Sequence, residues 1–134
     1  MTVLTPLRLI VVDDEASVGE ISLLQFRNAI KNGSLDFHFF EDAQDCVEYL
    51  SKENSDLQPT VIFTDINMPN YDGYDLLQEV KSEHPEIDVF MMSAYSDEQT
   101  IRKSMSMGAD GYFTKPVNYK NIKSEINEKY GVVF

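Results

Sequence analysis

Five side chains with the chemistry of a metal and phosphate site lie just past short, mainly apolar runs: Asp13, Asp14, Asp65, Ser93 and Lys115. Carboxylates that converge on one place repel one another, so a cation or the lysine must compensate their charge. Carboxylate oxygens with room for water suit Mg²⁺, a hard ion that prefers octahedral oxygen coordination. The lysine adds a compact positive charge and the serine a neutral hydroxyl. These residue types therefore predict a Mg²⁺ site beside groups that could bind a phosphate.

The reaction that this set matches is phosphoryl transfer to a carboxylate. Such a transfer needs an oxygen nucleophile held in line and charge stabilisation on the equatorial oxygens. Asp65 is the predicted nucleophile, because it projects from the central strand of the expected sheet. Mg²⁺ would neutralise part of the developing charge, while Lys115 binds one phosphoryl oxygen and Ser93 another. The chemistry requires no histidine, cysteine or activated serine.

Apolar runs alternate along the chain with stretches of helical period, which indicates five β-α units. Strands that alternate with helices imply an α/β fold with a parallel sheet covered on both faces. Ligands bind such sheets outside the carboxyl ends of the strands, so the five polar residues should converge on one edge. The expected strands are Leu7–Val12, Leu35 to about Glu41, Thr60–Thr64, Ile87–Met92 and Gly111–Thr114.

The helices expected between these strands carry apolar residues at helical spacing. The first, Glu15–Lys31, should present a broad apolar surface made of Val18, Ile21, Leu24, Phe26 and Ile30. A capping box of Ser96 and Gln99 predicts the start of the fourth. The last should run from about Tyr119 to Tyr130, and 51–59 reads as a polar loop. The whole chain, 1–134, is predicted to be one domain with a core from about 7 to 130.

Composition narrows the classes of partner. The formal net charge of −12 repels phosphate backbones, so direct nucleic-acid binding is not expected. No apolar run is long enough to cross a bilayer, and Met1–Arg8 lacks the pattern of a signal peptide. The single cysteine, Cys46, cannot form an internal disulfide and lies on an apolar helical stripe, so it reads as a buried thiol. Cytoplasm is the expected compartment.

The motifs resemble those of bacterial two-component response-regulator receiver domains, in the same order and over Leu7–Tyr130. The matching segments are Val11–Glu15, Thr64–Pro69, Asp72-Gly73, Met92–Ala94, Gly108–Tyr112 and Lys115-Pro116. The resemblance implies a flavodoxin-like, doubly wound five-stranded sheet of order 2-1-3-4-5. It also implies a cis Lys115-Pro116 bond.

The resemblance further assigns roles within the site. Asp65 is similar to the phospho-accepting aspartate of these domains. Asp14, Asp65 and the backbone carbonyl of Asn67 would ligate Mg²⁺, and Asp13 would reach the ion mainly through water. Ser93 would move toward the phosphate, and Tyr112 on the last strand would then move inward.

The same resemblance implies a signalling switch and not an enzyme, with at most weak self-phosphorylation and autodephosphorylation. Its phosphodonor would be a sensor histidine kinase or a histidine phosphotransfer protein. A downstream partner or an attached output domain would read the face made by the helix after Ser96, the strand Gly111–Thr114 and the last helix.

Two alternatives stay open. A small phosphohydrolase with an aspartyl-phosphate intermediate also places an aspartate beside Mg²⁺, but it usually has a second acid two residues after the nucleophile, where this chain has Asn67. A phosphate-independent interaction domain would keep only the fold, and the intact aspartates and Lys115 argue against it. Tyr112 could also be an ordinary packing residue of its strand.

Overall fold

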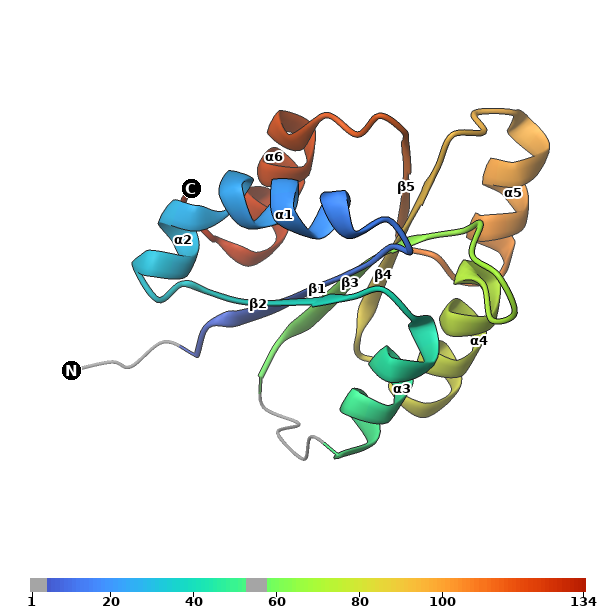
Figure 1. Ribbon diagram of the computed structural model, residues 1–134, viewed down its shortest axis with the longest axis horizontal. Helices are drawn as coiled ribbons and strands as arrows, with labels where there is room; N and C mark the ends of the chain where they lie inside the picture. Colours follow the sequence, from blue (N-terminus) through green and yellow to red (C-terminus); the bar gives the residue numbers. More distant parts are fainter. Residues whose placement is uncertain (1–4, 53–57) are drawn as a thin grey trace.

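A computed structural model describes residues 5–52 and 58–134 of the chain, which form a five-stranded parallel sheet between two layers of helices (Figure 1). The strand order, β2-β1-β3-β4-β5, confirms the order that the family resemblance implied. The strands are β1 (Leu7–Val12), β2 (Leu35–Phe40), β3 (Thr60–Asp65), β4 (Asp88–Ser93) and β5 (Gly111–Thr114). The helices are α1 (Ala16–Gln25), α2 (Arg27–Lys31), α3 (Ala43–Lys52), α4 (Gly73–Glu83), α5 (Glu98–Ser106) and α6 (Tyr119–Tyr130).

The two faces of the sheet bury two separate cores. Helices α1, α2 and α6 cover one face, and α3, α4 and α5 cover the other (Figure 1). Strands β1 and β3 are buried along their whole length, and for β1 the nearly continuous apolar run predicted this. On the α1–α6 side the rings of Phe63 and Phe90 stack with their centroids 4.8 Å apart. On the α3–α4 side Cys46 is buried, and burial raises the pKa of its thiol to about 12.

The first expected helix is divided, and only part of the apolar surface predicted for it is buried: Phe26 lies in the core and Val18 and Ile30 pack against it. The chain leaves α1 at Phe26, whose buried ring packs against Tyr119, and α2 follows. Ile21 and Leu24 are 46% and 66% exposed. The residues that α1 does bury are small, and a Cβ on Gly19 would lie 2.5 Å from the ring of Phe39. Helix α1 therefore approaches β2 through its small residues, with Val18 beside them against the core, and leaves Ile21 and Leu24 in solvent.

Two other local expectations need correction or fall outside the described residues. Helix α5 begins one residue later than predicted, because the side chain of Asp97 accepts the backbone N–H of Thr100 at 3.0 Å and forms the N-cap in place of Ser96. Of the expected loop 51–59, the first two residues end α3 and 53–57 lie outside the described residues, as does much of Met1–Arg8. Among the described helices, none is long and apolar enough to cross a membrane.

Candidate functional site

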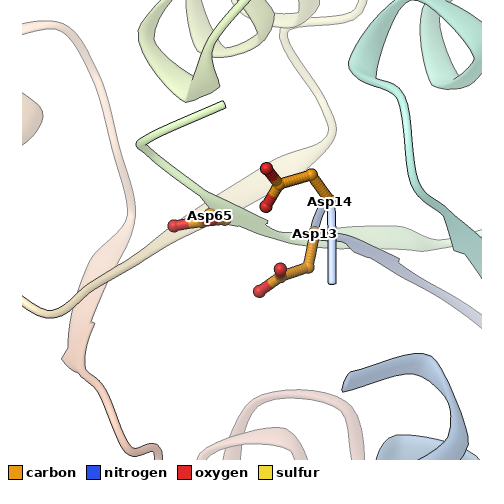
Figure 2. A group of neighbouring side chains, drawn as sticks. All are labelled: Asp13, Asp14 and Asp65. Carbon is orange, nitrogen blue, oxygen red and sulfur yellow. The ribbon is translucent and has the colours of Figure 1, made fainter. Parts of the chain in front are cut away.

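Three aspartates lie together at the carboxyl ends of two neighbouring strands. Asp13 and Asp14 follow β1, and Asp65 is the last residue of β3, the strand that pairs with β1. One carboxylate oxygen from each lies within 4.8 Å of the other two (Figure 2). Asp13 and Asp65 are buried, whereas Asp14 is exposed. The structure therefore brings together the acidic residues that the sequence analysis selected.

Lys115 directly follows β5, the strand at one edge of the sheet, and its side chain reaches the same cluster of aspartates. Its Nζ donates to Asp13 Oδ2 at 2.6 Å and lies 3.5 Å from Asp65 Oδ2. Its backbone N–H donates to the carbonyl of Ser93 at 2.7 Å, which joins the ends of β4 and β5. The bond from Lys115 to Pro116 is cis, as the resemblance implied. The ammonium group is thus shared by two of the aspartates, with the shorter contact to the fully buried one.

A neutral hydroxyl lies next to the acidic group. Ser93 is buried at the end of β4, and its Oγ accepts the backbone N–H of Tyr95 at 3.1 Å and the side-chain amide of Asn67 at 3.4 Å. The backbone N–H of Asn67 donates to Asp65 Oδ1 at 3.4 Å. Tyr112, on β5, is half-buried, and its hydroxyl donates to the carbonyl of Tyr95. Hydrogen bonds thus run from the loop after Asp65 to the last strand.

Burial and charge oppose each other at the two titratable partners. Burial raises the pKa of Asp65 above its ordinary value, and the positive charge of Lys115 does not fully offset this; the neighbouring Asp13 charge raises it further. Burial lowers the pKa of Lys115, but its hydrogen bond to Asp13 and the charges of Asp13 and Asp65 outweigh that effect, so its pKa is raised. Lys115 therefore stays charged at neutral pH, while ionised Asp65 remains unfavourable.

The donor set fits a hard divalent cation. All three side chains offer carboxylate oxygens, and the exposed Asp14 leaves one side open to water, which Mg²⁺ retains in its coordination shell. One ammonium against three carboxylates leaves a net negative charge for a cation to balance. A Cys- or His-selective metal would find no such ligand in this cluster.

A pH titration in Mg²⁺-free buffer should expose the unfavourable charge of Asp65. Its folded pKa lies above the unfolded value of 3.8, so between these two values the folded protein binds more protons than the unfolded chain. The contribution of Asp65 to stability must then fall as the pH rises through that interval. Denaturant unfolding of the parent and of Asp65→Asn at a series of pH values checks this. Identical pH profiles for the two proteins would contradict it.

Gly73 is a residue of the site whose structural role could not be predicted from the sequence. It is expected only as a loop residue and as part of a family motif, yet a Cβ there would lie 2.4 Å from the carbonyl oxygen of Asp65. The side chain of Asp72 caps α4 at this point by accepting the backbone N–H of Asp75 at 2.9 Å. Helix α4 therefore starts in direct contact with the backbone of Asp65, and only glycine allows that approach.

Comparisons with known proteins give the family to which this chain is similar. A family model described as "Response regulator receiver domain" matches residues 9–127. The DNA-binding transcriptional regulator NtrC of Proteus hauseri is 34% identical over 106 residues, which cover 79% of this chain and 21% of NtrC. The transcriptional regulatory protein KdpE of Staphylococcus aureus is 32% identical over 69% of this chain and 39% of its own length. The chain therefore spans less than half the length of these relatives.

Solved structures show the same fold at low sequence identity. The chemotaxis protein CheY4 of Vibrio cholerae is similar with a TM-score of 0.77 and 19% identity, over 96% of this chain and all of that one. The receiver domain of the Saccharomyces cerevisiae response regulator Ssk1, solved in a co-crystal with the histidine phosphotransfer signaling protein Ypd1, has a TM-score of 0.78 and 17% identity. It covers 95% of this chain, which covers 90% of it.

Proposed function

This chain belongs to the response regulator receiver domain family, and from that premise we propose that Asp65 accepts a phosphoryl group in a Mg²⁺-dependent phosphorelay. Domains of this family are signalling switches of two-component systems, not enzymes in the ordinary sense. The observation that carries the proposal is the gathering of Asp13, Asp14 and Asp65 around one place that Lys115 also reaches.

The roles of the individual residues follow from their positions. Asp14, Asp65 and the backbone carbonyl of Asn67 would hold Mg²⁺, with Asp13 acting mainly through water. The ion would neutralise charge on the transferred phosphoryl group. Asp65 supplies the attacking carboxylate oxygen. Lys115, already 3.5 Å from that carboxylate, would bind one phosphoryl oxygen.

The switch would use the hydroxyl that lies beside the acidic group. Ser93 Oγ would exchange its 3.4 Å contact with the amide of Asn67 for a phosphoryl oxygen. Tyr95 bonds Ser93 through its N–H and Tyr112 through its carbonyl, so a shift of this segment would reach β5. The face formed by α5, β5 and α6 would then change its affinity for a downstream partner or an attached output domain.

The phosphodonor would be a sensor histidine kinase or a histidine phosphotransfer protein, and α1 offers a surface for it. A groove of about 500 Å³ opens beside Lys115 and is lined mainly by apolar side chains, among them Val18, Val117 and Ile21. The exposed Leu24 is on the same helix, one turn beyond Ile21. Exposed apolar side chains beside a reactive group are typical of a binding surface.

Leu24→Asp should slow phosphorylation by a phosphorylated histidine phosphotransfer protein by about tenfold, because a charge would be buried in the interface. Phosphorylation by acetyl phosphate should keep the parent rate, since this small donor needs no docking surface. Val133→Asp, at a residue that is equally exposed and apolar, is the matched control and should leave both rates unchanged. Equal slowing with both donors would contradict the docking role of α1.

The proposed function is tested by intact-mass spectrometry after incubation with acetyl phosphate. One phosphoryl group per chain should appear with Mg²⁺ and not with EDTA. The phosphohydrolase alternative is not favoured by the family assignment, and it predicts instead many turnovers of a generic phosphomonoester. Absence of any Mg²⁺-dependent mass increase in folded protein would reject the proposal.

A further inference from the structure

The backbone that follows the nucleophile is fixed by hydrogen bonds on several sides. The N–H of Ile66 donates to the carbonyl of Met92 at 3.0 Å, and the carbonyl of Ile66 accepts the N–H of Gly73 at 2.9 Å. The carbonyl of Asp65 accepts the hydroxyl of Thr64 at 3.0 Å. The first two bonds join backbone to backbone, so the Thr64 hydroxyl is the partner that a single substitution can remove.

The Thr64 hydroxyl lies in a tightly packed part of the molecule, where α4 begins against the backbone of Asp65. Thr64 is fully buried in β3, directly before Asp65, and its hydroxyl bonds the carbonyl that the start of α4 approaches at Gly73. A Cβ on Gly73 would lie 2.4 Å from the Asp65 carbonyl oxygen and 2.7 Å from Ile66 Cα. Without Thr64 Oγ1, that carbonyl would lose the hydrogen bond of a fully buried donor, and the bond from the Ile66 N–H to Met92 would be left to hold the same peptide.

We propose that Thr64 is a positioning residue for phosphoryl transfer: its hydroxyl fixes the peptide between Asp65 and Ile66, and through it the direction of the Asp65 carboxylate. This inference rests on the proposed function. The same peptide leads to Asn67, whose backbone carbonyl is a proposed Mg²⁺ ligand. Reactive groups must be held to within a fraction of an ångström, and a shift of 1 Å can cost about a hundredfold in rate.

The test compares substitutions at two buried threonines of the same strand. Thr64→Val removes the hydroxyl and keeps the branched shape, and it should slow phosphorylation by acetyl phosphate roughly tenfold at fixed Mg²⁺. Thr64→Ser keeps a hydroxyl and should restore most of the rate. Thr60→Val is the matched control. Thr60 is the first residue of β3, at the opposite end of the strand from Asp65, and its hydroxyl donates to the carbonyl of Gln58 at 3.1 Å. The phosphorylation rate of Thr60→Val should therefore equal that of the parent.

Two further readouts separate positioning from general damage. Urea unfolding gives the folded fraction of each variant, by which its rate is corrected. Titration calorimetry should show weaker Mg²⁺ binding by Thr64→Val than by Thr60→Val. If Thr64→Val does not fold, Thr64→Ala removes the same hydroxyl with less strain on its neighbours and is judged by the same measurements.

The outcomes are distinct. A parent-like corrected rate and Mg²⁺ affinity for Thr64→Val overturn the role of Thr64 while leaving the proposed function intact. Equal slowing by Thr60→Val, or no recovery in Thr64→Ser, overturns it as well. If the folded parent takes up no phosphoryl group, the proposed function fails and this inference fails with it.

Discussion

Asp65→Asn is expected to take up no phosphoryl group from acetyl phosphate in the presence of Mg²⁺. The substitution replaces the carboxylate nucleophile by an amide, which attacks phosphorus poorly, and it leaves the shape of the site nearly unchanged. It should also raise the free energy of unfolding at neutral pH without Mg²⁺, because burial makes the ionised form of Asp65 unfavourable, as its raised pKa shows. Intact-mass spectrometry and urea unfolding measure the two effects.

The matched control for this loss is Asp45→Asn, an exposed carboxylate on α3. Its phosphoryl uptake and stability should match those of the parent. Uptake by Asp65→Asn at the parent level would show that another residue accepts the phosphoryl group. Loss of uptake with equal loss of folded protein would show instead that the substitution acts on the fold.

Lys115→Met is expected to have the second large effect, on stability and on phosphorylation together. It leaves the fully buried carboxylate of Asp13 without its ammonium partner at 2.6 Å, and the backbone N–H of Glu15, at 2.9 Å, remains as a donor. Breaking a buried ion pair on one side costs about 3 kcal/mol or more. Phosphorylation should slow by about a hundredfold, because one phosphoryl oxygen loses its cation.

A double substitution separates these two effects of Lys115. Adding Asp13→Asn to Lys115→Met removes the uncompensated charge and should recover much of the unfolding free energy in Mg²⁺-free buffer. Phosphorylation should stay slow, because the lysine is still absent. Lys120→Met, at an exposed lysine of α6, is the control and should behave as the parent. A single Lys115→Met variant as stable as the parent would contradict the electrostatic account.

Much of the fold could be predicted because its signals are local. A nearly continuous apolar run marked β1 as a buried strand, and the alternation of such runs with helical stretches implied a parallel sheet. Such a sheet places the carboxyl ends of its strands along one edge, so the polar residue after each strand had to belong to one site. The strand order followed from family resemblance, not from local pattern, and the structure confirms it.

The face that α1 buries could not be predicted, because hydropathy alone does not tell how closely a helix approaches a sheet. The apolar period predicted that Ile21 and Leu24 would share one surface with Phe26, but Phe26 is buried and the other two are exposed. The contact with β2 is made at Gly19, where the ring of Phe39 leaves no room for a side chain. An apolar face left in solvent beside the site is the kind of departure that function produces.

By itself, the sequence determined which chemical groups this protein brings to the sheet edge: three carboxylates, one hydroxyl and one ammonium, each at the end of a strand. Only the tertiary structure decided which of them touch. Lys115 bonds Asp13, 102 residues away, more closely than Asp65, and Thr64 bonds the carbonyl of the residue that follows it. The reason is that strand pairing and helix contact set distances of a few ångströms, whereas a sequence pattern fixes only the order and type of residues.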